Sequence, residues 1–198
     1  MNIVPHPTTT ADTQLARALA RDLDGTFERL VLAHQDRLYT IAVRLLGDPR
    51  DAEEVAQDAF VRAYRAIAGY PPERVRTLAL RGWLAAIVVN LARNRYRRRP
   101  AAAMELAVEP VEADRAAIPH EAATLTESHR AWAALLASLP DRYRVPVVLR
   151  HVDGLSFAEM AAALGRPEGT LKAQVHRGLG LLRTAYLRTQ SAPEELSA

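Results

Sequence analysis

Hydrophobic residues recur along most of the chain at steps of three and four, which is the spacing of one helix face. The first such stripe runs from Phe27 to Leu45 and stops before Gly47. Asp48 can cap a new helix, and Pro49 suits its first turn. The pattern therefore predicts two consecutive amphipathic helices in the first part of the chain.

The second of these helices has one apolar face and one acidic edge. Its apolar positions are Ala52, Val55, Ala56, Ala59, Phe60, Ala63 and Ile67. A loop containing Pro71 and Pro72 ends it, and helical spacing resumes over about 78–98. The apolar stripe of this third helix is Leu84, Ile87, Val88 and Leu91.

Helical spacing returns after residue 125, and Pro140 begins a further helix. Ser156 and Glu159 have the spacing of a capping box, which begins a short helix. After a tight turn, a last helix is predicted over about 170–188. A short helix, a tight turn and a second helix make a helix-turn-helix. The face expected to pack on the preceding helix is Leu171, Val175, Gly178, Leu179 and Leu182.

Strand patterns are nearly absent, so the predicted fold is all-α: two small helical domains joined by a flexible acidic linker, the C-terminal one containing the helix-turn-helix. The expected division is a partly disordered N-terminal extension over 1–24, a helical domain over 25–100, the linker over 101–127, the helix-turn-helix domain over 128–190 and a tail over 191–198.

Composition removes several classes of function. The chain contains no cysteine, which excludes a disulfide framework and thiolate zinc sites. Its six histidines are scattered without an HExxH spacing, so we expect no metal, no cofactor, no catalytic residues and no enzymatic activity. No apolar run is long enough for a bilayer and no secretory signal is visible, which predicts a cytoplasmic protein without membrane insertion.

The formal net charge of +3 hides a division of charge along the chain. In residues 1–100, 16 arginines against 11 acids give +5, whereas residues 101–127 carry −5. Residues 128–190 again carry +5. Two basic segments separated by an acidic one favour phosphate contacts at both ends of the chain.

Three polar surfaces are candidate binding sites. The second helix has an acidic edge that suits a basic protein surface. The third carries arginines and asparagines on one face with Trp83 and Tyr96 nearby, a combination that suits melted DNA. The outer face of the last helix, including Lys172 and Arg177, suits a DNA major groove. The alternatives are a solvated acidic edge, an arginine-rich helix end that complements the helix dipole, and a plain helical hairpin.

These stretches, in this order, resemble the extracytoplasmic-function (group 4) sigma factors of the sigma-70 family of bacterial RNA polymerase. The resemblance rests on GDPRDAEEVAQDAFVRAYRAI, RGWLAAIVVNLARNRYRRR and LPDRYRVPVVLRHVDGLSFAEMAAALGRPEGTLKAQVHRGL. It covers residues 25–100 and 128–188, which correspond to sigma regions 2 and 4. It implies promoter-specific transcription initiation through −35 and −10 elements, with help in promoter melting.

The resemblance also assigns residues. Core-polymerase binding falls to Asp51, Glu53, Glu54, Gln57 and Asp58. Contacts to −10 DNA fall to Tyr70, Arg74, Arg76, Trp83, Asn90, Arg93, Asn94, Arg97 and Arg98. Contacts to −35 DNA fall to Arg166, Thr170, Lys172, Ala173, Gln174, His176 and Arg177. The implied partners are the β′ and β subunits of core RNA polymerase, promoter DNA and an anti-sigma factor.

Three points remain open at this stage. A stand-alone helix-turn-helix regulator with an N-terminal dimerisation or sensing domain is the alternative function. Pro146 lies within a helix that is usually continuous, and we expect it to kink this helix or shift its register. Gly178 and Gly180 are expected to weaken the last helix by about 1 kcal/mol each relative to alanine.

Overall fold

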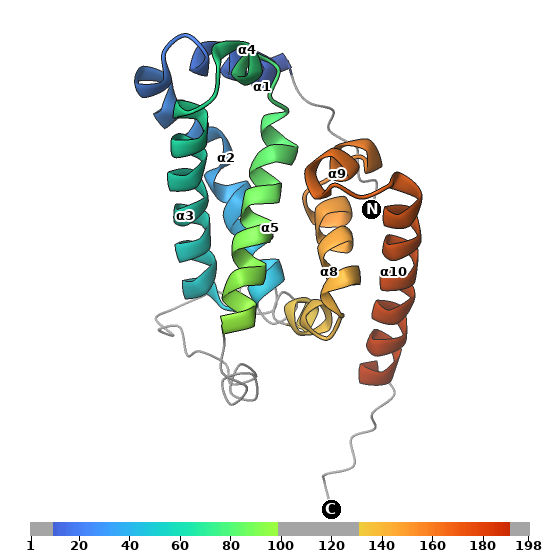
Figure 1. The fold of residues 1–198 in the computed structure, drawn as a ribbon. Coiled ribbons are helices and arrows are strands. Elements are labelled where there is room, and N and C mark those ends of the chain that lie inside the picture. Colours follow the sequence, from blue (N-terminus) through green and yellow to red (C-terminus); the bar gives the residue numbers. More distant parts are fainter. Residues whose placement is uncertain (1–9, 99–130, 191–198) are drawn as a thin grey trace, which may run out of the picture.

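The protein, described by a computed structural model for residues 10–98 and 131–190, is all-helical in those ranges and forms two bundles that lie side by side (Figure 1). The all-α prediction is confirmed. The first bundle contains α1 (Thr10–Leu19), α2 (Leu23–Leu46), α3 (Pro49–Ala68), α4 (Pro72–Arg76) and α5 (Leu80–Arg98). The second contains a helical segment over 131–137, α8 (Asp141–Val147), η1 (Val148–Val152), α9 (Phe157–Leu164) and α10 (Glu168–Gln190).

The turn between α2 and α3 follows the predicted chemistry. Gly47 ends α2 with a φ of 74°, and its N–H donates to the carbonyl of Val43. Glycine suits this left-handed position because it has no Cβ. The side chain of Asp48 then accepts hydrogen bonds from the backbone N–H groups of Arg50 and Asp51, which caps α3.

The core of the first bundle lies between α2, α3 and α5. All seven apolar positions predicted on α3 are buried. On α5, Leu84, Val88 and Leu91 are buried as expected, while Ile87 is only partly buried. The loop expected between α3 and α5 contains the short helix α4, whose Val75 is buried in this core.

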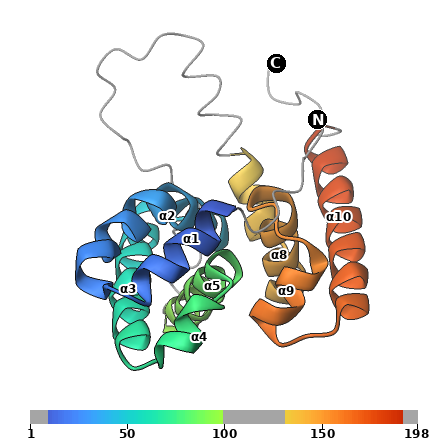
Figure 2. The ribbon, with the colours of Figure 1, turned by 90° about the horizontal axis from the view of Figure 1, so that it is seen from above.

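The segment expected to be an N-terminal extension contributes to the first bundle. Helix α1 buries Leu15, Ala16 and Leu19 and packs on α2 and α4 (Figure 2). Its Asp12 lies 3.4 Å from the Nε2 atom of His34 on α2. His34 lies within the predicted helical stripe from Phe27 to Leu45; it is buried, and it also has this polar neighbour. Residues 1–9 lie outside the described part.

The helical register changes after Pro146, where a kink or a register shift was expected. The segment that follows, η1, is a π-helix, in which the N–H of Asp153 donates to the carbonyl of Val148 over 3.1 Å. Further along, Ser156 and Glu159 form the predicted capping box of α9.

Helix α10 begins two residues earlier than expected and packs on α8 and α9. Leu171, Val175 and Leu182 are buried as predicted, but Leu179 is 41% exposed, so its predicted packing role is wrong. Gly178 instead faces α8 so closely that a Cβ there would lie 2.7 Å from Cγ2 of Val147.

The two bundles contact each other through α5, which packs on α9 (Figures 1 and 2), and through α2, which packs on η1. The predicted linker over 101–127 and the tail over 191–198 lie outside the described residues. Within the described residues, no helix is both long and apolar enough to cross a membrane.

Candidate polymerase and nucleic-acid interfaces

The acidic edge of α3 is divided between internal and exposed residues. Glu53, Gln57 and Asp58 are exposed, and the amide of Gln57 donates to Glu53 over 3.3 Å. Asp51 is half-buried and accepts hydrogen bonds from Nε and Nη2 of Arg95 on α5, at 2.9 and 2.6 Å. The acidic edge therefore presents part of its charge outward and uses part to hold α5.

Arg95 was not identified from the sequence. Its Nη2 atom also lies 2.7 Å from Glu54. The hydrogen bond to Asp51 raises the pKa of Arg95, assisted by the charges of Asp51 and Glu54 and opposed by desolvation. Because several arginines lie near the C-terminal end of α5, the sequence did not show that Arg95 is the one that contacts α3.

An aromatic and cationic stack lies where α4 meets α5. The rings of Tyr70 and Trp83 are 6.3 Å apart between centroids and tilted by 60°. The guanidinium carbon of Arg74 lies 3.7 Å from the centroid of the Tyr70 ring. The structure thus brings together three residues predicted to bind −10 DNA, in an arrangement that can stack an unpaired base. Arg76, also predicted, is exposed and lies 3.4 Å from Glu73.

The polar face of α5 continues from this stack towards the end of the helix. Asn90, Asn94, Arg97 and Arg98 are exposed there. Nη2 of Arg97 donates to the side-chain oxygen of Asn94 over 3.0 Å, which holds the two side chains together on this face.

Arg93, unlike these residues, is not exposed. It is half-buried between the bundles, in a small pocket shared with Tyr96, Asp141 and Arg144. Burial lowers the pKa of Arg93, and the neighbouring charge of Arg166 lowers it further, while Asp141 opposes the shift. Of the residues predicted on the α5 face, it is the one turned towards the second bundle.

The outer face of α10 presents most of the predicted −35 residues together. Thr170, Lys172, Ala173, His176 and Arg177 are exposed. Arg166 and Gln174 are half-buried, and Nη1 of Arg166 donates to Gln174 over 3.4 Å. Lys172 lies 3.7 Å from Glu168 and 5.6 Å from the ring centroid of Phe157. The result is a basic surface at the N-terminal half of a long exposed helix.

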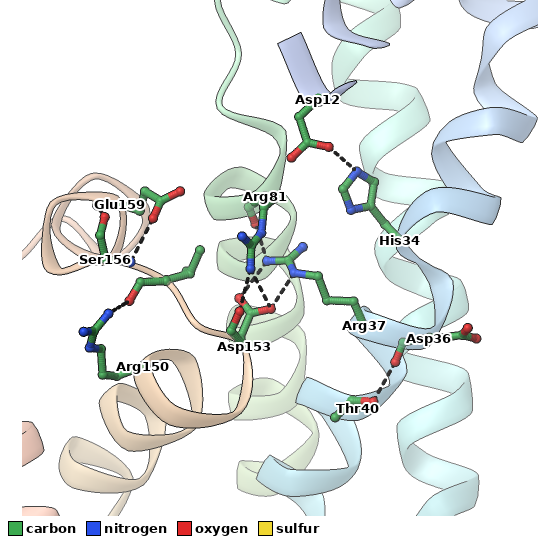
Figure 3. A network of polar contacts seen from close by, with 11 residues as sticks. Asp12, His34, Asp36, Arg37, Thr40, Arg81, Arg150, Asp153, Ser156 and Glu159 are labelled. Atoms are coloured by element: carbon green, nitrogen blue, oxygen red, sulfur yellow. Dashed lines mark hydrogen bonds and ion pairs between the residues drawn. The ribbon is translucent and has the colours of Figure 1, made fainter. Parts of the chain in front are cut away.

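A buried ionic cluster between the bundles was also missed. Arg37 and Arg81 of the first bundle meet Asp153 of the second (Figure 3). The sequence contained one signal, because Arg81 interrupts an otherwise apolar run, and a charge at such a position requires a buried partner. The position of Asp153 before Gly154 indicated only a helix end.

Neither a metal centre nor a covalent catalytic arrangement was expected. Among the described residues, no group of three or more His, Asp or Glu side chains could hold a metal ion. The candidate surfaces described above consist of carboxylates, cations, amides and aromatic rings.

Two family models match the two bundles. The model of Sigma-70 region 2 matches residues 30–101, and that of Sigma-70, region 4 matches residues 129–182. These ranges contain the acidic edge and α5 in one case and the helix-turn-helix in the other.

Curated relatives extend this similarity to most of the chain. The ECF RNA polymerase sigma factor SigE of Mycolicibacterium smegmatis is 35% identical over 175 residues, covering 87% of this chain and 66% of that protein. SigW of Bacillus subtilis, also an ECF sigma factor, is 32% identical over 167 residues, covering 79% of this chain and 87% of that protein.

Solved structures agree with the fold. CnrH, in complex with the cytosolic domain of CnrY, superposes with a TM-score of 0.67 at 29% identity, covering 91% of this chain and 99% of that one. The sigma factor RpoE of Bartonella quintana superposes with a TM-score of 0.59 at 21% identity, covering 80% of this chain and 94% of that one. The chain therefore belongs to the ECF sigma factors of the sigma-70 family, subunits that direct RNA polymerase to initiate transcription at specific promoters.

Proposed function

We propose that this protein binds core RNA polymerase in the cytoplasm and directs it to promoters with −35 and −10 elements, without catalysis of its own. The observation that carries the proposal is the presence, on one chain, of two separate DNA-type surfaces. One is the aromatic stack with the polar face of α5, and the other is the outer face of α10.

The exposed part of the acidic edge is the proposed contact to core polymerase. Glu53 and Asp58 are exposed on α3. An acidic helix repels DNA and suits a basic protein surface, for which the β′ subunit is the expected partner.

The stack of Tyr70, Trp83 and Arg74 is the proposed site for unpaired bases of the −10 element. Unstacking a base costs a few kcal/mol, and stacking it on an aromatic ring returns about 1–3 kcal/mol. Arg97 and Asn94 then meet the backbone of the same strand. This surface would favour promoter melting because it binds the product of melting.

The outer face of α10 is the proposed reader of the −35 duplex. Its N-terminal half follows the turn of the helix-turn-helix, the part of a recognition helix that enters the major groove. Lys172, His176 and Arg177 project from it. Arg166 and Gln174 hold each other at its base and provide a fourth polar contact point.

We also propose regulation by a separate protein, an anti-sigma factor. The relative CnrH was solved with the cytosolic domain of CnrY, a protein partner. Because this chain contains no cysteine, it has no thiol with which to sense redox state itself.

Run-off transcription tests the proposed function. Purified core polymerase is incubated with genomic fragments, with and without this protein, and the transcripts are mapped at their 5′ ends. The proposal predicts new transcripts that start at a common distance from shared sequence elements. Transcripts that are identical with and without the protein would contradict it.

The same purified protein can also be used to distinguish a sigma factor from the alternative, a stand-alone regulator. A stand-alone helix-turn-helix regulator would bind its operator tightly without polymerase. For a sigma factor we expect the free protein to bind promoter fragments weakly, and core polymerase to increase its retention on them in a mobility-shift assay.

A further inference from the structure

The ring of Phe157 lies where three elements of the second bundle meet. Phe157 is the first residue of α9 and packs, half-buried, against the hydrophobic core. The guanidinium carbon of Arg150 on η1 lies 5.1 Å from the centroid of this ring, and Nζ of Lys172 on α10 lies 5.6 Å from the same centroid. One aromatic ring is therefore within cation–π distance of two cations from different elements.

Hydrogen bonds fix the backbone around this ring. Nη1 of Arg150 donates to the carbonyl of Leu155 over 3.0 Å (Arg150 in Figure 3). In the capping box, the N–H of Ser156 donates to Oε2 of Glu159 over 2.8 Å, and the N–H of Glu159 donates to Oγ of Ser156 over 3.2 Å. Because these bonds restrict the chain on both sides of Phe157, its ring has a defined position and can hold a flexible neighbour.

Lys172 has two partners of different kinds. Its Nζ lies 3.7 Å from Oε2 of Glu168, one turn earlier on α10, and the two side chains are 59% and 47% exposed. An exposed ion pair of this kind contributes little and is screened by salt. A phosphate that binds Lys172 competes with Glu168, whereas an aromatic ring attracts the cation without neutralising its charge. The ring of Phe157 is therefore the partner that can stay in contact while Lys172 binds DNA.

Lys172 needs such a partner more than the arginines around it do. It is the only lysine of the chain, and the other 25 basic residues are arginines. Its ammonium group is a point charge on a flexible four-carbon stem, and fixing that stem when DNA binds costs conformational entropy. A contact that restricts Lys172 before DNA arrives reduces this cost.

We propose that Phe157 is a positioning residue for recognition of the −35 element, because its ring holds the ammonium group of Lys172 at the outer face of α10. The proposal rests on the function proposed above and adds a residue from outside the recognition helix. Arg150 contacts the same ring from η1 and fixes its position. Since Phe157 acts through Lys172, its effect on DNA binding disappears when Lys172 is removed.

A double-mutant cycle between Phe157 and Lys172 tests this dependence. Holoenzyme is assembled from core polymerase and each variant, and fluorescence anisotropy gives its affinity for a labelled promoter duplex that carries the −35 element. We expect Phe157→Leu to weaken binding about two- to fivefold when Lys172 is present, and to have little further effect in the Lys172→Ala background. Equal losses in the two backgrounds would overturn the proposal, because Phe157 would then act through folding alone.

Two further variants separate the aromatic ring from general packing. Phe157→Tyr keeps the aromatic face and should bind at least as tightly as wild type. Leu164→Ala removes a partly buried apolar side chain near the other end of α9, and any loss it causes should be the same with and without Lys172. A tyrosine variant as defective as Phe157→Leu, or a coupling of Leu164 to Lys172 as large as that of Phe157, would contradict the role of the ring.

Removal of Glu168 tests the other partner of Lys172. Glu168→Gln should leave binding to the −35 duplex unchanged or strengthen it, because the phosphate no longer competes with a carboxylate. A loss as large as that of Phe157→Leu would show that the carboxylate positions Lys172, and it would overturn the proposal. The proposed function fails separately if wild-type holoenzyme binds this duplex no more tightly than one with a scrambled −35 sequence.

Discussion

Nη2 of Arg95 lies 2.6 Å from Oδ1 of Asp51 and so joins the C-terminal part of α5 to the first turn of α3. The side chain of Asp51 is only 15% exposed, whereas Glu53 and Asp58 are exposed. A substitution of Asp51 therefore changes the packing of the first bundle as well as the charge of its surface. Contact with core polymerase is better tested at the exposed acids.

Reversal of charge at Glu53 and Asp58 should weaken binding to core polymerase without unfolding the protein. For Glu53→Arg with Asp58→Arg we expect at least about a tenfold loss of affinity, because like charges now face the proposed basic surface of the polymerase. Fluorescence anisotropy of the labelled protein with core polymerase measures the loss. The matched control is Glu28→Arg with Asp36→Arg, two exposed acids of α2; equal losses in both variants would contradict a specific site.

Loss of the Trp83 ring should impair promoter opening more than promoter binding. Because one stacked base contributes about 1–3 kcal/mol, we expect Trp83→Ala to reduce open complexes by roughly 10- to 100-fold. Permanganate reactivity of unpaired thymines in the −10 region measures opening. Trp83→Phe retains a stacking surface and should lose less.

A template with a pre-melted −10 segment separates this role from general instability. Activity of Trp83→Ala on that template should approach the wild-type level, because the cost of unpairing has been removed. A variant that remains equally defective on the pre-melted template would show that Trp83 is needed for folding or core binding instead.

Removal of two cations from α10 should weaken recognition of the −35 element. Lys172→Ala with Arg177→Ala should lower transcription from a −35-dependent promoter by at least about tenfold and flatten its salt dependence, since phosphate contacts release counterions. Arg183→Ala with Arg188→Ala removes two exposed cations farther along the same helix and should have a smaller effect. A double variant that transcribes the −35-dependent promoter as strongly as wild type, and still prefers it over a promoter without the −35 sequence, would contradict this assignment.

The buried carboxylate of Asp12 predicts a pH-dependent contribution to stability. Desolvation alone would raise its pKa, but interactions with His34, Arg81 and Arg37 lower it below the ordinary value. A lowered folded-state pKa stabilises the protein above the unfolded pKa and loses that contribution as the pH falls through the folded pKa. Asp12→Asn should therefore cost about 1–2 kcal/mol at pH 7.

Urea denaturation at several pH values measures this effect. The difference between wild type and Asp12→Asn should be constant near neutral pH and shrink below about pH 4, the ordinary carboxyl pKa. Asp36→Asn, at an exposed position of α2, is the control. A difference that does not change down to acid pH would mean that the charge of Asp12 is not what stabilises the helix pair.

Local chemistry predicted the helices well. The helix end at Gly47, the cap at Asp48 and the capping box of α9 each depend on residues close in sequence, and each is confirmed. The register also changes after Pro146, at the place where a kink or a register shift was expected.

Contacts between distant segments were not predictable in the same way. Arg95 was one arginine among several at the end of α5, and the pairing with Asp51 depends on how α3 and α5 cross. Likewise, helical spacing placed Arg93 among the DNA-facing residues, but it could not show that the second bundle covers that side of α5. Periodicity identifies the face of a helix, whereas tertiary packing decides what lies opposite.

The two glycines of α10 also show that the sequence does not reveal what lies opposite a residue. They offer a matched pair of substitutions. From sequence, Gly178 and Gly180 were both expected to weaken the helix, and only Gly178 was placed on its packing face. In the structure, a Cβ at Gly178 would lie 2.7 Å from Val147 and 3.3 Å from Cβ of Tyr143, whereas nothing lies within 4 Å of a Cβ at Gly180. Gly178 therefore permits the close approach of α10 to α8.

Alanine substitution should consequently have opposite effects at the two positions. Gly180→Ala should stabilise the protein by about 0.5–1 kcal/mol through helix propensity alone. Gly178→Ala should destabilise it by about 1–3 kcal/mol, because α10 must move away from Val147 and lose apolar packing. Thermal unfolding followed by circular dichroism measures both shifts. Stabilisation by Gly178→Ala equal to that by Gly180→Ala would mean that α10 and α8 do not pack at this distance.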